Sequence, residues 1–157
     1  MGRSWRSLVI VGLVVPWLLL PQPVASASAN DVVGMWNILA TLIVESGDPR
    51  DPTRPKPGFQ KPDRWNITSN GQGLVLTGSQ GSITGQLTAQ GATFFGRYPI
   101  PVGKFQGFVQ IRIECMVAGP GVMQGGEEIL YFMPNGLGQI QTVPLGREAW
   151  RFMARRN

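Results

Sequence analysis

The segment 105–117 alternates between apolar and polar side chains with a period of two. Phe105, Val109 and Cys115 belong to its apolar set, whereas Arg112 and Glu114 belong to its polar set. This period is typical of a β-strand that has one buried face and one solvated face. The sequence therefore predicts a strand here, with Cys115 on the buried face.

Shorter segments with the same period lie before and after this strand, and tight turns containing glycine separate them. The segments are 64–69, 73–78, 82–89, 93–100 and 122–134, and two of the turns are Asn70-Gly71 and Gln90-Gly91. Strands that repeat about every ten residues with tight turns between them are typical of an all-β sandwich or barrel.

Three glycines lie in the middle of these strands on the expected inner face. Gly85, Gly96 and Gly107 follow one another at intervals of eleven residues. A glycine inside a strand weakens it, so such glycines usually mark a strongly coiled sheet or crowded packing. This spacing favours a barrel, and the predicted fold is an all-β, closed, antiparallel up-and-down meander of about eight strands.

The segment 30–46 is expected to form a long first strand, with Trp36 and Leu42 on one face. Helix is the alternative, because Leu39, Leu42 and Ile43 also fit helical spacing. As a strand, its second face carries Leu39 and Ile43, so a second layer, a helix or a partner chain is a candidate to cover it.

The C-terminal third is less regular. Alternation fails at Gly125-Gly126, as a β-bulge would cause. Beyond it, 138–144 predicts a closing strand and 147–156 predicts a strand or a short helix.

The N-terminus has the pattern of a secretory signal peptide. Arg3 and Arg6 precede the apolar run 8–20, and small residues then offer cleavage sites after Ala27 or Ala29. The run is too short for a membrane span, so we expect a secreted or periplasmic protein with no span after cleavage. The predicted organisation is a signal peptide at 1–29 and a β-barrel domain at 30–157, which includes a Pro-rich loop at 47–64.

The charge balance of the mature chain is weak. The full chain has a net charge of +5, and loss of Arg3 and Arg6 leaves 14 − 2 = 12 basic residues against 9 acidic ones, or +3. No basic stripe interleaved with aromatics is present, so a nucleic-acid partner is not expected.

The Pro-rich segment 47–64 is predicted to be a long, stiff loop. Its five prolines lack the backbone donor that an interior strand needs. They are Pro49, Pro52, Pro55, Pro57 and Pro62. The loop is either a solvated connection or a lid, in which case Phe59, its single aromatic residue, would fold back onto the barrel.

Common catalytic groups are missing. The sequence contains no histidine and a single cysteine, which excludes histidine-based triads, the ordinary zinc sites and an internal disulfide. Glu127 and Glu128 are adjacent, so in a regular strand they face opposite sides, and only a bulge at Gly125-Gly126 would re-aim one of them. We therefore expect no enzymatic activity, no metal and no cofactor.

The expected inner face is apolar and aromatic, with few polar groups. Its large members are Trp36, Trp65, Phe94, Tyr98, Phe105, Trp150 and Phe152. An eight-stranded barrel is narrow enough for such side chains to fill it, or wide enough to leave one small ligand site. Both outcomes stay open.

Gly34-Met35-Trp36 on the first strand resembles the G-x-W start of the calycin barrels, the lipocalins and avidins. In lipocalins this tryptophan closes the barrel floor beneath a late arginine, a role the resemblance gives here to Arg151 or Arg155. The typical lipocalin disulfide and second motif are absent, as is the tryptophan-rich biotin box of avidin.

Two functional hypotheses follow. The first is an exported binding module that takes a small apolar or amphipathic ligand at the barrel mouth, with Trp36, Phe59, Trp65 and Tyr98 as contacts. The second is a structural or inhibitory protein-interaction domain with a solid core, which presents the Pro-rich loop or the outer face of the first strand to a protein partner.

Overall fold

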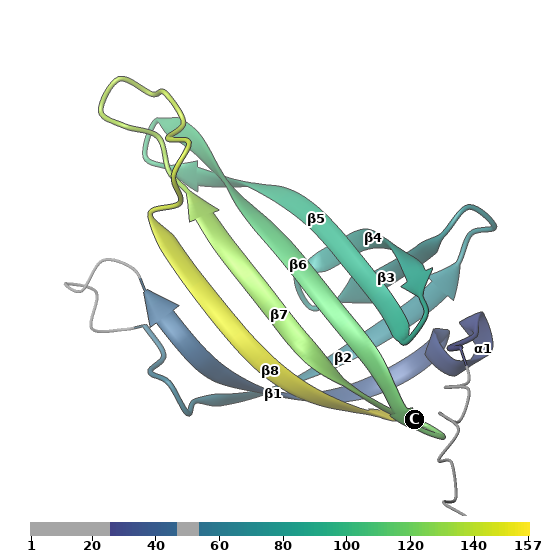
Figure 1. The fold of residues 1–157 in the computed structure, drawn as a ribbon. Coiled ribbons are helices and arrows are strands. Elements are labelled where there is room, and N and C mark those ends of the chain that lie inside the picture. Colours follow the sequence, from purple (N-terminus) through teal and green to yellow (C-terminus); the bar gives the residue numbers. More distant parts are fainter. Residues whose placement is uncertain (1–25, 47–53) are drawn as a thin grey trace, which may run out of the picture.

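The computed structural model describes residues 26–46 and 54–157, and within these ranges the chain forms a closed antiparallel barrel of eight strands (Figure 1). Each strand pairs with the next, and β1 pairs with β8 to close the barrel. The strands are β1 (Gly34–Ser46), β2 (Gln60–Ser69), β3 (Leu74–Gly78), β4 (Gly81–Thr88), β5 (Gly91–Val102), β6 (Phe105–Gly119), β7 (Val122–Phe132) and β8 (Gly146–Arg156). The predicted up-and-down meander is confirmed.

The two ambiguous terminal segments are both strands. β1 takes up most of 30–46, after the short helix α1 (Ala29–Val32), and β8 takes up 147–156. The expected closing strand at 138–144 is wrong: this segment belongs to the loop between β7 and β8, where a single bridge joins Pro134 to Ile140. In the described ranges no helix is long and apolar enough to cross a membrane.

The mid-strand glycines lie at crowded positions, as predicted. A Cβ on Gly85 would lie 2.8 Å from Cγ of Phe94, and one on Gly107 would lie 2.6 Å from the carbonyl oxygen of Phe132. These distances are well inside van der Waals contact, so the inner face has no room for side chains there.

The expected bulge at Gly125-Gly126 is wrong. The register of β7 with β6 runs without a shift from Met123 to Phe132. Gly125 is required for a different reason, because a Cβ there would lie 2.7 Å from Cζ of Phe152. Alternation along β7 therefore continues, and Glu127 faces the barrel interior by ordinary strand geometry.

β1 contains a bulge that the sequence pattern did not reveal. Its register with β8 shifts between Leu42 and Val44. The shift exchanges the two faces for the rest of the strand, so Glu45 lies opposite Glu148 on the inner side. Val44 is exposed as a result.

β2 begins earlier than the Pro-rich segment led us to expect. It starts at Gln60, and Pro62 pairs with Leu39 of β1. β3 pairs only with residues 66–69 of β2, so the first half of β2 has a neighbour on one side only. Proline has no backbone N–H to donate. It is tolerated at such an edge because no neighbouring strand is there to accept a hydrogen bond. The edge leaves a gap between β2 and the β3–β4 turn.

One end of the barrel is closed by α1 and the end of β8 (Figure 1). The indole nitrogen of Trp36 donates to the carbonyl oxygen of Val32 at 2.8 Å. The guanidinium of Arg156 lies 4.9 Å from the centre of the Trp36 ring and donates to the carbonyl oxygens of Asn30 and Asp31.

This closure has the form that the calycin resemblance implied, but the arginine is Arg156 and not Arg151 or Arg155. Strand parity decides the difference. The inner positions of β8 are the even ones, such as Phe152 and Ala154, so Arg151 and Arg155 project outward and are exposed.

The interior near the closed end is solidly packed. Buried side chains of every strand contribute to a single apolar cluster. Cys115 belongs to it, as predicted, and burial raises the pKa of its thiol to about 12.

Candidate functional site

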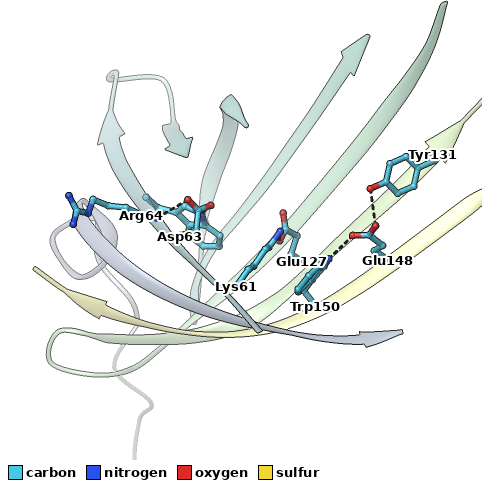
Figure 2. Close-up of polar contacts among 8 residues, drawn as sticks. Lys61, Asp63, Arg64, Glu127, Tyr131, Glu148 and Trp150 are labelled. Atoms are coloured by element: carbon cyan, nitrogen blue, oxygen red, sulfur yellow. Dashed lines mark hydrogen bonds and ion pairs between the residues drawn. The ribbon is translucent and has the colours of Figure 1, made fainter. Parts of the chain in front are cut away.

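The half of the interior away from the closed end, called the polar half below, carries charged side chains among apolar ones (Figure 2). Lys61 and Asp63 enter it from β2, Glu127 enters from β7 and Glu148 enters from β8. The expectation of an inner face with few polar groups is therefore wrong for this half. The alternation of side chains along a strand could have predicted these positions, because Lys61 and Asp63 lie on the same face of β2 as the inward Trp65.

Each oxygen of the Glu148 carboxylate accepts a hydrogen bond from an aromatic side chain. It accepts hydrogen bonds from the hydroxyl of Tyr131 at 3.0 Å and from the indole nitrogen of Trp150 at 2.9 Å. Burial, together with the neighbouring charge of Glu148, raises the pKa of Tyr131. These bonds fix the Trp150 ring in the barrel wall.

A second pair lies close to the open end. Arg54 donates to Glu45 at 2.7 Å, and its guanidinium lies 5.3 Å from the centre of the Tyr131 ring. The hydrogen bond that Arg54 donates to Glu45 raises the pKa of Arg54. This contact ties the chain before β2 to the bulged end of β1.

Lys61 lies between an aromatic face and a carboxylate. Its ammonium nitrogen is 4.1 Å from the centre of the Trp150 ring and 3.8 Å from Oε2 of Glu127. Aromatic faces attract cations at this range through their quadrupole. Lys61 thus shows how this part of the barrel accommodates an ammonium group.

The carboxylate of Glu127 has few polar partners for a charged group that is largely buried. Its side chain is only 10% exposed, and among the described residues its one polar contact is the ion pair with Lys61. Loss of solvent is the main cause that raises its pKa, the charges of Asp63 and Glu148 add to the rise, and Lys61 opposes it. A buried carboxylate without hydrogen-bond donors is energetically costly.

Asp63 is held in a defined orientation. One of its oxygens accepts the backbone N–H of Arg64 at 2.8 Å, and the other accepts the indole N–H of Trp65 at 3.1 Å. The Arg64 side chain projects away from the barrel interior (Figure 2). The carboxylate and the indole of Trp65 therefore act as one rigid unit of the wall.

A small cavity lies beside these groups, at the gap between β2 and the β3–β4 turn. Its volume is about 30 Å³, enough for roughly two water molecules. Its walls include Lys61, Asp63, Trp65, Tyr98 and Glu127. The hydroxyl of Tyr98 donates to the carbonyl oxygen of Ser82 at 2.8 Å, and burial raises its pKa.

The four residues expected to contact a ligand do not form one cluster. Trp65 and Tyr98 share the cavity wall. Phe59 is 50% exposed and meets the Trp150 ring edge-on, with 6.4 Å between ring centres. Trp36 is buried beneath Arg156 at the closed end, outside the cavity wall.

In residues 26–46 and 54–157, no three side chains of His, Cys, Asp or Glu come close enough together to hold a metal ion.

Comparison with known proteins gave one match. A scan against protein-family models found none, and a search of curated proteins found none. Among solved structures, a chain described as "Structure of EF1p2_mFAP2b bound to DFHBI" is 12% identical in sequence with a TM-score of 0.44. The alignment spans 82% of this chain and 96% of that chain.

Proposed function

We propose that this protein is a non-catalytic binding module that takes a small amphipathic molecule in the polar half of its barrel. The observation that carries the proposal is the cavity at the β2 edge, where Trp65 and Tyr98 lie beside Asp63, Lys61 and Glu127. Ligand sites combine mostly apolar walls with a few polar groups that orient the ligand. The polar walls favour an amphipathic ligand over a purely apolar one.

The arrangement of the carboxylates supports binding over catalysis. Glu148 accepts hydrogen bonds from Tyr131 and Trp150, one on each carboxylate oxygen, and it lies outside the cavity wall. Glu128, the neighbour of Glu127, faces outward and pairs with Arg147 at 2.8 Å. The adjacent pair therefore cannot work together as acid and base.

Native mass spectrometry of the protein purified from its own source tests this proposal. We expect an additional small mass that disappears on denaturation. Leu76→Phe, which adds bulk at the cavity wall, should abolish the additional mass. Leu74→Phe is the matched control, because Leu74 is equally buried on the same strand but outside the cavity wall. An adduct that survives Leu76→Phe would place the ligand elsewhere, and a bare mass throughout would reject the proposal.

A protein-interaction domain is the second candidate, and one observation favours it. On the outer surface Leu39 of β1 is 50% exposed and pairs with Met153 of β8, which is 51% exposed, with Ile43 and Met116 nearby on the same groove. Leu39→Lys should lower the apparent mass in light scattering if the chain self-associates through this face. A monomer mass for both the wild type and Leu39→Lys would count against self-association through this face.

The Pro-rich loop is the other surface expected for such a domain, and its residues 47–53 lie outside the described residues.

We also propose export, with cleavage of the signal peptide after Ala27. Residues 1–25 lie outside the described residues, but Ser28 donates from its backbone nitrogen and its hydroxyl to Asp31, at 2.9 and 2.7 Å. Cleavage after Ala29 would remove both of these hydrogen bonds at the start of α1. N-terminal sequencing of the exported protein should begin at Ser28, and a start at Asn30 would contradict the assignment.

A further inference from the structure

The walls of the cavity carry an excess of negative charge. Asp63 and Glu127 contribute two carboxylates and Lys61 contributes one ammonium group, so the formal sum is −2 + 1 = −1 when all three are ionised. The whole chain is positive, at +5. The negative charge at this site is therefore local and is not a reflection of overall composition.

The open half of the barrel beyond the cavity adds to this excess. Glu45 and Glu148 face inward there, and Arg54 is the cation that pairs with Glu45. The sum of these three groups is again −2 + 1 = −1. In the cavity and in the open half beyond it, an anionic ligand would meet charges of its own sign, and a cationic ligand would meet charges of the opposite sign.

The hydrogen bonding of Glu127 indicates more about the ligand. Its side chain is nine-tenths buried, lines the cavity and receives no hydrogen bond from the described residues. A neutral hydroxyl would supply a hydrogen bond but would leave the excess charge in place. A group that carries both donors and a positive charge satisfies both needs, and an ammonium group carries both.

The cavity wall combines aromatic rings with carboxylates, as the surroundings of the Lys61 ammonium group do. Lys61 packs on the Trp150 face beside Glu127, at 4.1 and 3.8 Å. Trp65 and Tyr98 line the cavity beside Glu127 and Asp63. The combination of an aromatic face and a carboxylate is a recurrent way to bind organic cations.

We propose that this cavity binds the ammonium group of a small organic cation, with Glu127 and Asp63 as its counter-charges. The inference rests on the proposed binding function and names the ligand class for that same site. Because about 30 Å³ holds roughly two waters, the cavity takes the ammonium head and about one methylene group. The apolar remainder lies against Trp65 and Tyr98 and leaves through the gap between β2 and the β3–β4 turn.

Binding should depend on pH in a defined direction. Burial raises the pKa of Glu127, and the groups that face it are Lys61 and Asp63 from β2, Glu148 from β8 and Tyr98 across the cavity. A bound ammonium favours the ionised carboxylate, so binding displaces any proton on Glu127. The affinity for an ammonium ligand should therefore rise with pH as Glu127 ionises.

Calorimetric titration of the mature protein with three probes of equal chain length tests the proposal. The probes are n-butylammonium chloride, n-butanol and sodium n-butyrate. We expect n-butylammonium to bind about tenfold more tightly than n-butanol, and n-butyrate to bind most weakly. Equal binding of all three, or preference for n-butyrate, would overturn this inference and leave the proposed binding function standing. If none of the three probes binds, both the ammonium-ligand inference and the proposed binding function are rejected for this site.

Variants then assign the effect to the cavity. Glu127→Gln should weaken n-butylammonium about tenfold and leave n-butanol unchanged, because it removes charge but keeps size. Glu128→Gln is the matched control, since Glu128 faces outward, and it should change neither affinity. Asp63→Asn is the second variant if Glu127→Gln does not fold. Lys61→Met should tighten n-butylammonium binding by removing a like charge. An unchanged preference in Glu127→Gln or Asp63→Asn would overturn the proposal.

Discussion

Glu127 is a buried carboxylate whose burial is opposed, among the described residues, by its ion pair with Lys61 alone. Its pKa is raised by burial above the ordinary value of 4.5, so the folded protein binds this proton more tightly than the unfolded chain does. Ionisation of Glu127 therefore lowers stability as pH rises above 4.5. Proteins commonly give up stability in this way at sites that serve a function.

Glu127→Gln should consequently stabilise the unliganded protein at neutral pH. We expect a gain of about 1 kcal/mol, the general cost of a poorly satisfied buried group, or about 3 °C in melting temperature. The gain should disappear near pH 4, where wild-type Glu127 is protonated. Thermal melts at pH 4 and pH 8 check this, with Glu128→Gln as the control. A lower melting temperature for Glu127→Gln at pH 8 would show that the ion pair with Lys61 outweighs the burial cost.

Cys115 illustrates the opposite case, a titratable group used only for packing. Burial raises the pKa of its thiol to about 12, so almost no thiolate exists at neutral pH. We expect no reaction with a thiol reagent such as 5,5′-dithiobis(2-nitrobenzoic acid) in the folded protein, and one equivalent of reaction in guanidinium. Rapid modification without denaturant would mean that the strand pair β6–β7 opens frequently.

At the level of the strands, the inward glycines set how closely neighbouring strands approach. Gly85→Ala would force a Cβ to within 2.8 Å of Cγ of Phe94. Overpacking of this kind typically costs about 1–3 kcal/mol. Gly126→Ala is the control, because the nearest atom to its Cβ would be the Trp150 carbonyl oxygen at an ordinary 3.5 Å. Urea denaturation should show a clear loss for Gly85→Ala and little change for Gly126→Ala. Equal losses of unfolding free energy in the two variants would mean that these glycines are needed for their backbone flexibility and not because a Cβ would clash.

The same strands show what sequence patterning can and cannot predict. Alternation and turn residues were enough for β6 and the meander, because a half-buried strand carries its pattern locally. Lys61 and Asp63 were assigned to a loop, since Pro62 is compatible with a strand only at an edge and edges depend on pairing. The inward position of Glu45 was equally hidden, because it depends on a register shift between β1 and β8.

Across the described residues, α1 closes one end of the barrel (Figure 1), and the half away from it carries the inward charged side chains. The closed end joins α1 to the last residues of β8 through Arg156. The polar half contains the cavity and the carboxylates, away from this closure. A solid end and a partly hollow one therefore coexist, and the two halves should respond independently to substitution.

Arg156→Ala tests this division directly. The variant loses the contact with the Trp36 ring and two hydrogen bonds to carbonyl oxygens of α1, so we expect a loss of about 1 kcal/mol, or about 3 °C. Arg155→Ala is the control, because Arg155 is exposed on the outer face. Binding of n-butylammonium by folded Arg156→Ala should equal that of the wild type, because the cavity lies in the other half of the barrel. A matching loss of affinity would show that the Trp36 closure sets the shape of the cavity through β1 and β2, which pair at Trp36 and Trp65.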